Sequence, residues 1–426
     1  MKICELRKYI EDGALDSVIE GELMLDAGET REKYLAALEK FAELFGAERD
    51  VHIYSVGGRT EVSGNHTDHN LGCVLAAAVN LELLCIAASR DDGVVRVHSE
   101  GFPEDVVERS TVDSPDETKF FTSAAIIAGM QKAFLNSGRK IGGFDAYTVS
   151  AVLKGSGLSS SAAFEVMIGN VLNYMYNDGT VDNKEIAQMA QYAENVYFGK
   201  PCGLMDQMAC AVGGFISIDF EDKNDPKVDK IDFDLNRAGY AMCIVNTGGN
   251  HADLNDDYAS VPREMKGVAE LLGKTVLREC TADEVISAAG EIREKLGDRA
   301  FMRAMHFFSE NERVEKISDA LKAGDIDAFL SGIKDSGSSS FKFLQNVYTT
   351  KNVEEQGISL ALCLTERFIS GRRAAARVHG GGFAGTIQVF LPSDIAEEYK
   401  TYIESVFGSG SCYMLSLRGA GAVCLK

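Results

Sequence analysis

The sequence predicts a globular protein of two or three domains in which strands and helices are mixed. Its 426 residues exceed the usual size of a single domain. With 45% hydrophobic and 25% charged residues, the composition is ordinary for a globular protein with a large core. Alternating and helix-like apolar patterns both occur along the chain, and several are separated by glycine-rich stretches.

The N-terminal part begins with an acidic, weakly helical stretch, residues 1–28, which we interpret as an N-terminal extension. An amphipathic helix is expected over residues 31–45, with Gly46 ending it. The apolar face of this helix contains Tyr34, Leu38, Phe41 and Phe45. The other elements expected before the central loop are strands at 51–56, 81–88 and 94–98 and a helix at 120–134.

The central feature is a loop of small residues between a strand at 147–153 and a helix that carries Phe164, Ile168 and Val171 on one face. Glycines allow the backbone to approach a ligand, and the N–H groups and dipole of a helix N-terminus favour an anion such as phosphate. The loop residues are Gly155, Ser156, Gly157, Leu158, Ser159, Ser160 and Ser161.

Taken alone, this loop leaves a flexible connector as an alternative. It lacks the Gly-Lys-Ser/Thr ending of a Walker loop. Ser160 also stands where the dinucleotide-binding fingerprint requires its third glycine.

A second unusual stretch, residues 57–72, is expected to be a polar turn between apolar strands. It brings Arg59, Asn65, His66 and Asp68 close together in sequence. These side chains pair donors with acceptors, which suits a polyhydroxylated ligand, although a polar surface loop stays an alternative. A metal site on His66 and His69 is disfavoured, because no cysteine or second carboxylate completes it.

The third stretch follows a helix expected over residues 182–196, where Asp182 and Glu185 form a capping box and Glu194 lies in the last turn. Asp206 then stands alone among apolar residues. A lone buried carboxylate is costly, so Asp206 is either a helix cap or a functional group.

The second half of the chain is expected to begin with residues 231–246, which include a strand at 242–245. Residues 246–258 are polar and loop-like, and Pro262 is expected to open a helix. Helical patterns dominate to about residue 370, and a glycine run at 380–385 then precedes a strand at 386–391.

The net charge and the cysteine pattern narrow the classes of partner and the cellular location that we expect for this protein. The net charge of −21 argues against nucleic acid or an anionic membrane as the main partner. The ten cysteines form no Cys-x-x-Cys pair and are expected to be buried, reduced thiols. Most lie in apolar runs: Cys73, Cys85, Cys243, Cys363 and Cys424. With no apparent signal peptide and no apolar run long enough to span a bilayer, a cytoplasmic location is expected.

Four stretches in this order resemble the motifs of the GHMP kinase superfamily, and most closely those of the galactokinase family. Residues 58–70 are similar to Gly-Arg-x-(Asn/Glu)-x-x-Gly-Glu-His-Thr-Asp-Tyr-Asn, and residues 155–162 to the GHMP phosphate loop. Residues 202–207 are similar to Cys-Gly-Ile-Met-Asp-Gln, and residues 380–385 to Gly-Gly-Gly-Phe-Gly-Gly. The resemblance spans about residues 30–426.

The resemblance implies an α+β, two-domain GHMP kinase fold. Its N-terminal domain would be ribosomal-S5-like and its C-terminal domain ferredoxin-like, with the active site in the cleft between them. The expected divisions are residues 1–28 as the extension, 29–232 as the domain with the sugar signature and phosphate loop, and 233–426 as the C-terminal domain.

The resemblance also implies roles for individual residues. Asp206 matches the catalytic aspartate and Arg59 the arginine beside the transferring phosphoryl group. Ser161 and Glu194 match magnesium ligands, and residues 155–161 would hold the phosphates of ATP. The positions that match sugar contacts are Asn65, His66, Asp68, Gly203 and Tyr258.

The implied activity is phosphorylation of the anomeric hydroxyl of galactose by ATP with Mg²⁺, in a monomer. Alternatives are a kinase for a related monosaccharide, such as N-acetylgalactosamine, arabinose or a uronic acid, and a non-catalytic galactose and ATP sensor on the same fold. Because Arg59, Asp206, Glu194 and Ser161 are all present, the enzyme is favoured.

Three residues depart from the family pattern. Asn65 stands where the family has a sugar-binding glutamate, His69 replaces a tyrosine, and Leu153 replaces the proline that often opens the phosphate loop. The first departure leaves the sugar open, because an amide donates as well as accepts and carries no charge.

Overall fold

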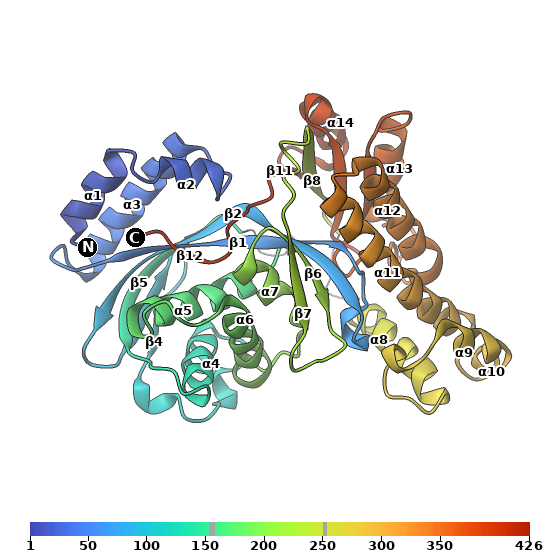
Figure 1. The fold of residues 1–426 in the computed structure, drawn as a ribbon, viewed down its shortest axis with the longest axis horizontal. Coiled ribbons are helices and arrows are strands. Elements are labelled where there is room, and N and C mark those ends of the chain that lie inside the picture. Colours follow the sequence, from blue (N-terminus) through green and yellow to red (C-terminus); the bar gives the residue numbers. More distant parts are fainter. Residues whose placement is uncertain (153–157, 250–253) are drawn as a thin grey trace.

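The computed structural model describes residues 1–152, 158–249 and 254–426. Within these ranges the chain forms an eight-stranded sheet and a four-stranded sheet with helices packed on both (Figure 1). The expected mixture of strands and helices is therefore confirmed. Leu153, Gly155, Ser156 and Gly157 lie outside the described residues.

The first sheet is built around two long strands, β1 (His52–Ser63) and β2 (Cys73–Arg90). Its main path runs β12-β1-β2-β5-β3-β4, while β6 pairs with β2 and β7 pairs with β6. The β3–β5 pair is parallel and the other described pairs are antiparallel. The shorter strands are β3 (Val95–Ser99), β4 (Asp105–Val107), β5 (Gly143–Ser150), β6 (Phe215–Asp219), β7 (Lys227–Ile231) and β12 (Val423–Cys424).

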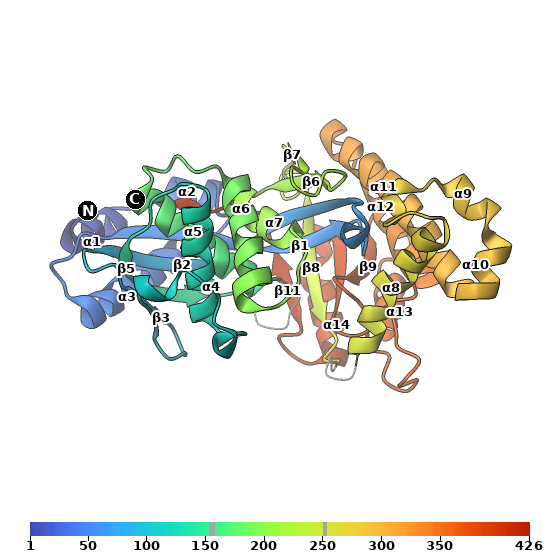
Figure 2. The same ribbon diagram turned by 90° about the horizontal axis from the view of Figure 1, so that it is seen from below.

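Helices cover both faces of this sheet (Figures 1 and 2). Because strand side chains alternate, Ile53 and Ile86 face one helical layer whereas Tyr54 and Cys85 face the other. The first layer contains α1 (Ile3–Glu11), α2 (Asp16–Gly21) and α3 (Ala27–Phe45). The second contains α4 (Ser123–Asn136), α5 (Ser160–Tyr176), α6 (Asn183–Tyr192) and α7 (Met205–Val212).

The first 28 residues are more regular than their weak helical pattern predicts. They form α1 and α2, and Leu6, Ile10 and Ile19 are fully buried in the cluster that also contains Ile53 of the sheet. Packing of an apolar face stabilises these short helices, whose own propensity is modest.

The second sheet has the order β11-β8-β10-β9. Its strands are β8 (Tyr240–Asn246), β9 (Ala375–His379), β10 (Thr386–Pro392) and β11 (Cys412–Leu415). The helices that pack on this sheet are α12 (Ile326–Ser339), α13 (Gly357–Phe368) and α14 (Ala396–Phe407). α11 (Asp298–Ala323) packs on α12 and carries α8 (Asn255–Leu271), α9 (Ala282–Ser287) and α10 (Ala289–Leu296). One buried cluster joins Leu75 of the first sheet to Met242 and Phe390 of the second, so the two halves share a core.

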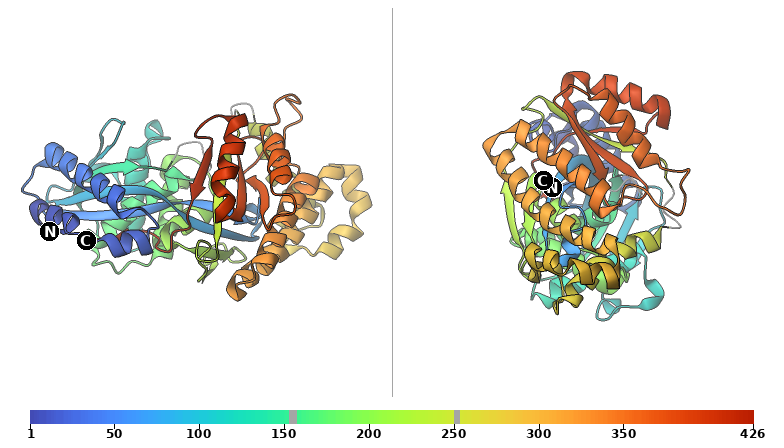
Figure 3. Two further views of the ribbon diagram at one scale, coloured as in Figure 1. Left: turned by 90° about the horizontal axis from the view of Figure 1, so that it is seen from above. Right: turned by 90° about the vertical axis from the view of Figure 1, so that its right-hand side faces the viewer.

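The two ends of the chain lie side by side (Figure 3). β12 pairs with β1, so the C-terminal residues return to the first sheet after the second is complete. The expected division of the chain at residues 28 and 232 stays a prediction.

Short helical turns connect the main elements: η1 (Asp68–Asn70), η2 (Arg109–Thr111), η3 (Glu117–Lys119), η4 (Ala193–Phe198), η5 (Leu277–Glu279), η6 (Ser340–Leu344) and η7 (Ser393–Ile395).

The polar turn expected over residues 57–72 is partly wrong. β1 continues to Ser63, and the register with β2 shifts between Gly57 and Gly58 and again between Glu61 and Ser63. A Cβ on Gly57 would lie 2.6 Å from the Val79 carbonyl oxygen, so glycine permits close strand pairing at this bulge.

The helix expected to open at Pro262 begins earlier, at Asn255. Asp256 and Asp257 lie in its first turn, where the helix dipole favours negative charge. Tyr258 therefore lies on α8 and not in the expected loop.

At α6, Asp182 caps the helix by accepting from the Lys184 amide, but Glu185 binds Arg139 and does not complete a capping box.

All ten cysteines are free thiols, as expected. Cys363 is exposed, however, because it lies on the outer side of α13, so the expectation that it is buried is wrong. Across the three described ranges, no helix combines the length and apolarity needed to cross a membrane.

Packing of α1 against the sheet predicts a stability difference between two substitutions on this helix. Leu6→Ala should lower the free energy of unfolding by about 2–5 kcal/mol, because it opens a cavity in a fully buried site. Lys8→Ala, on the exposed side, should change it by less than about 0.5 kcal/mol. Urea denaturation measures both. Equal effects would show that residues 1–11 are not integrated into the fold.

Candidate active site

An ion pair between Arg59 of β1 and Asp206 of α7 forms the centre of the candidate site. Nε of Arg59 donates to Oδ1 of Asp206 at 2.7 Å, and Nη2 donates to Oδ2 at 2.6 Å. The Arg59 side chain is 10% exposed and that of Asp206 is 31% exposed, so the pair is reachable from one side. Burial alone would raise the pKa of Asp206, but the Arg59 charge and the Ser159 hydroxyl outweigh it and lower that pKa. Asp206 is therefore held as a carboxylate.

The end of the predicted phosphate loop rests on this ion pair. The Ser159 hydroxyl donates to Asp206, and the Leu158 carbonyl accepts from the backbone N–H of Arg59 at 3.2 Å. Ser159 has a left-handed backbone, with a φ of 54°, and α5 begins at the next residue. Ser160 and Ser161 thus form the first turn of α5, where unsatisfied N–H groups attract an anion.

Glu194 lies on η4, a π-helical segment, and is 2% exposed. Its Oε1 accepts from Nζ of Lys200 at 3.0 Å and its Oε2 from Nε2 of Gln207 at 2.8 Å. The same Gln207 nitrogen donates to Oε2 of Glu165 at 3.0 Å. Burial, followed by the charge of Glu194, raises the pKa of Glu165 well above its ordinary value. Because Ser161 lies one turn before Glu165 on α5, it belongs to the same corner of the site.

A cavity of about 220 Å³ adjoins the ion pair. Its lining residues are Glu61, Gly64, Asn65, His66, Asp68, Val74, Met205 and Gly381. Gly203 lies against it, since a Cβ there would stand 2.4 Å from Oδ2 of Asp68. Burial raises the pKa of Asp68, and the charge of His66 opposes this effect.

Two α11 side chains hold the turn at the edge of this cavity. Oε1 of Glu310 accepts from the Ser63 hydroxyl and from the Gly64 N–H, each at 2.9 Å. Nε2 of His306 lies 2.9 Å from the Asn65 carbonyl oxygen and its Nδ1 lies 2.8 Å from the Ser339 hydroxyl. Because a carbonyl only accepts, Nε2 carries the proton and Nδ1 accepts from Ser339. This arrangement requires a neutral ring. Burial lowers the pKa of His306 to about 4, so the ring is neutral at pH 7.

The glycine run brings the C-terminal half to the cavity. His66 Nε2 donates to the Gly381 carbonyl at 2.9 Å, and the Tyr258 hydroxyl donates to the Gly382 carbonyl at 2.8 Å. A Cβ on Gly381 would lie 2.8 Å from the Tyr258 ring, so glycine allows the tyrosine to pack there. Tyr258 therefore supports the glycine run beside the cavity.

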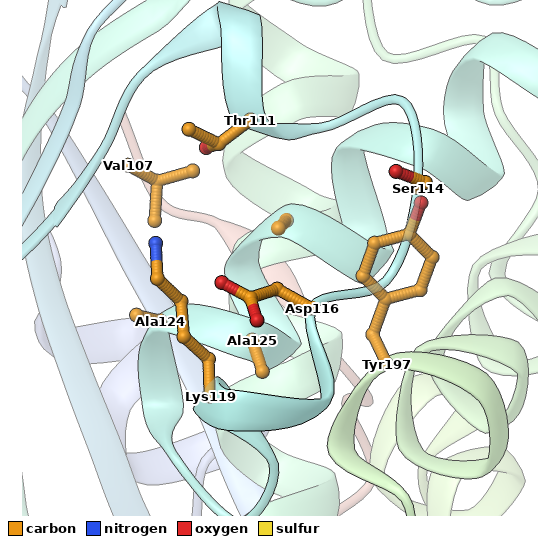
Figure 4. A pocket seen from close by; sticks show the side chains of 9 residues that line it. Val107, Thr111, Ser114, Asp116, Lys119, Ala124, Ala125 and Tyr197 are labelled. Carbon is orange, nitrogen blue, oxygen red and sulfur yellow. The ribbon is translucent and has the colours of Figure 1, made fainter.

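A smaller pocket lies at the start of α4 (Figure 4). Asp116 and Lys119 border it, and Tyr197, one turn after Glu194, closes one side and donates its hydroxyl to the Val112 carbonyl at 2.7 Å. The other lining residues are Val107, Thr111, Ser114, Ala124, Ala125 and Ala128.

The structure brings most of the predicted site residues together. Arg59, Asp206 and Ser159 meet directly, Glu194 and Ser161 share one corner, and Asn65, His66 and Asp68 line the cavity. Their roles stay predictions. Within the described ranges no group of three His, Cys, Asp or Glu side chains is placed to hold a metal ion, and His66 and His69 only pack with ring centres 5.8 Å apart.

Sequence reasoning missed several residues that shape the site, among them Glu61, Gln207 and the α11 pair. His306 and Glu310 lie four residues apart and Arg303 lies three before His306, so all three share one helix face. Three polar side chains on a face that should be apolar were a detectable signal.

Comparisons with known proteins show which family this chain is similar to. The family model of the GHMP kinases N terminal domain matches residues 123–214, and that of the galactokinase galactose-binding signature matches residues 39–89. A galactokinase of Streptomyces coelicolor is 32% identical over 377 residues, 87% of this chain and 92% of that protein. A galactokinase of Homo sapiens is 30% identical over 404 residues, 91% of this chain and 96% of that protein.

Solved structures are similar along nearly the whole chain. The structure of Lactococcus lactis galactokinase complexed with galactose has a TM-score of 0.77 and 25% identity, and covers 92% of this chain and 99% of that one. Methanococcus jannaschii mevalonate kinase has a TM-score of 0.60 at 14% identity, covering 86% and 98%, which shows a common fold. The two-domain α+β fold expected from the motifs is thereby confirmed.

The neutral His306 predicts how stability depends on pH. Since the folded pKa of about 4 lies below the ordinary 6.5, the unfolded chain binds more protons between these values, and stability falls as the pH drops through this range. His306→Gln should remove this loss. From pH 7 to pH 4.5, urea unfolding should show wild type losing about 2 kcal/mol more than the variant. If the free energy of unfolding fell equally in both proteins between pH 7 and pH 4.5, the lowered pKa of His306 would be refuted.

Proposed function

Because this chain belongs to the galactokinase family within the GHMP kinases, we propose that it transfers the γ-phosphoryl group of ATP to the anomeric hydroxyl of galactose. The observation that carries the proposal is the Arg59–Asp206 pair, which lies between the end of a phosphate-type loop and a cavity lined by polar side chains. A sugar in this cavity would present a hydroxyl to Asp206 while the helix start of α5 holds phosphate.

In the proposed reaction a bond forms between the anomeric oxygen and the γ-phosphorus, and the bond from that phosphorus to the bridging oxygen of ADP breaks. Asp206 accepts a hydrogen bond from the hydroxyl and orients it. Its lowered pKa makes it a weak base, which suits a loose transition state in which the hydroxyl proton passes to Asp206 late. Arg59 donates to the transferring group and stabilises its developing charge.

The residues proposed to hold magnesium fit this ion. Glu194 and Ser161 offer a carboxylate and a hydroxyl, the hard oxygen ligands that Mg²⁺ prefers. The Lys200 ammonium bound to Glu194 supports a cation at this position. Mg²⁺ usually takes one or two protein ligands, with phosphate oxygens and water as the rest. When bound there, it would neutralise phosphate charge.

We further expect the enzyme to act as a monomer in the cytoplasm, without nucleic acid or membrane as partner, in keeping with its net charge of −21.

The test of the substrate is a panel of sugars with coupled detection of ADP. Galactose should give the highest kcat/KM among galactose, N-acetylgalactosamine, arabinose, galacturonate and glucose. A tenfold higher value for another sugar would refute the choice of galactose but leave sugar phosphorylation intact. ADP release that does not depend on any sugar would refute the kinase proposal.

Asp206→Asn should lower kcat by at least about 10²-fold, because the amide no longer accepts the proton or orients the hydroxyl as a carboxylate does. Circular dichroism and the unfolding midpoint check that the variant folds. The control is Asp232→Asn, an exposed carboxylate in the segment that precedes β8, which should retain wild-type turnover. Turnover of Asp206→Asn within tenfold of wild type would contradict the role.

Glu194→Gln should raise the Mg²⁺ concentration needed for half-maximal turnover by tenfold or more, because it removes the anionic ligand. Calorimetry without nucleotide should show galactose binding within twofold of wild type. Glu185→Gln, which removes a carboxylate from nearby α6, is the control for both measurements. Equal losses in magnesium response and in sugar affinity would contradict a metal role for Glu194.

A further inference from the structure

We propose that Glu61, and not Asn65, supplies the carboxylate that binds the sugar, and that Asn65 positions it. The inference rests on the proposed function, since it concerns recognition of galactose in the same cavity. It reassigns a contact that the family pattern places at residue 65, where this chain has an amide.

Asn65 has no hydrogen-bonding capacity left for a ligand. Its Nδ2 donates to Oε1 of Glu61 at 2.9 Å and to the Gly380 carbonyl at 2.8 Å. Its Oδ1 accepts from Nδ2 of Asn346 at 2.7 Å and from the Ser340 hydroxyl at 3.4 Å. A primary amide has two N–H donors and two acceptor lone pairs, so all four are used, and the residue is fully buried.

Glu61 is fixed through only one of its carboxylate oxygens. Oε1 accepts from Asn65 and from Nη2 of the fully buried Arg377 at 3.0 Å, so the protein holds the side chain in one orientation. No hydrogen bond to Oε2 is formed by any residue in the described ranges. Glu61 is 6% exposed, and it lines the cavity beside the Arg59–Asp206 pair. A carboxylate oxygen with hydrogen-bonding capacity to spare, on a residue that lines a cavity, is suited to accept from a sugar hydroxyl.

The position of Glu61 along β1 suits the far side of a sugar whose anomeric hydroxyl lies at Asp206. Arg59 and Glu61 pair regularly with Ala78 and Ala76 of β2, so their side chains leave the same face of the strand. Two residues along a strand span about 7 Å, which is comparable to the width of a pyranose ring. Glu61 would therefore contact a hydroxyl at C-3, C-4 or C-6.

The family pattern allows either an amide or a carboxylate at position 61 and has a carboxylate at position 65, whereas this chain has the carboxylate at 61 and the amide at 65, hydrogen-bonded to each other. Arg377 balances the charge of Glu61, which makes this arrangement electrostatically tolerable. A glutamate at position 65 would face the carboxylate of Glu61 and the carbonyl of Gly380 with no N–H to donate. Restoring the family residue alone should therefore damage the site, whereas exchanging both residues should repair it.

The test measures steady-state kinetics with galactose and with 3-, 4- and 6-deoxygalactose in wild type, Glu61→Gln, Glu61→Asp, Asn65→Glu and the double variant Glu61→Asn with Asn65→Glu. Glu61→Gln should raise the KM for galactose about tenfold, the usual difference between a charge-assisted and a neutral hydrogen bond. It should also lower about tenfold the ratio of kcat/KM for galactose to kcat/KM for one of the deoxy sugars. The KM for ATP should not change. The double variant should be closer to wild type than Asn65→Glu is.

Two results would overturn the proposal: a galactose KM for Glu61→Gln within twofold of wild type, or discrimination against all three deoxy sugars that matches wild type. If Glu61→Gln does not fold, Glu61→Asp decides, because shortening the side chain should also raise the galactose KM tenfold while keeping the charge beside Arg377. Failure of the proposed function would look different, because wild type itself would then not phosphorylate galactose.

Discussion

The Arg59–Asp206 ion pair is the interaction on which the rest of the site depends. It joins β1 to α7, and through Ser159 and the Leu158 carbonyl it also fixes the end of the phosphate loop. Removing Asp206 would leave the mostly buried Arg59 charge uncompensated, which is unfavourable. The same two groups lie next to the cavity, whose lining includes Met205 beside Asp206 and Glu61 two residues along β1 from Arg59. The interaction that stabilises this junction therefore also sets the proposed reacting groups in place.

Cations paired with carboxylates at the site reconcile the strongly acidic composition with an anionic substrate. The net charge is −21, yet Arg59, Lys200 and Arg377 are each bound to a carboxylate at the site, and the start of α5 adds the partial positive charge of its dipole. These side chains are hydrogen-bond donors that now bind carboxylates, and a phosphate group could accept from them in the same way. Electrostatic preorganisation of this kind is usually the largest contribution to catalysis of phosphoryl transfer.

The sequence was most informative where a motif is contiguous. Arg59 and Asp206 are 147 positions apart and were both identified, because each lies in a short recognisable stretch. The glycines at 57 and 58 misled, since they serve a bulge inside β1 and not a turn. Pro262 misled for a similar reason, because α8 begins before it. Neither residue type reveals locally whether the neighbouring strand or helix continues.

Contacts between distant side chains could not be predicted from the sequence. Glu61 meets Arg377 across 316 positions, and Glu310 meets Gly64 across 246. The role of Asn65 follows only from counting its four hydrogen bonds, which need the folded positions of Gly380, Asn346 and Ser340. A departure from a family pattern thus becomes interpretable once its neighbours in space are known.

The most direct test of the account is to identify the phosphorylated product of wild type by ³¹P and ¹³C NMR after incubation with ATP, Mg²⁺ and galactose. A cavity that presents the anomeric hydroxyl to Asp206 predicts a single product, galactose 1-phosphate, formed in equal amount to ADP. Phosphate on another hydroxyl, or inorganic phosphate without a sugar phosphate, would contradict this placement of the sugar against Arg59 and Asp206.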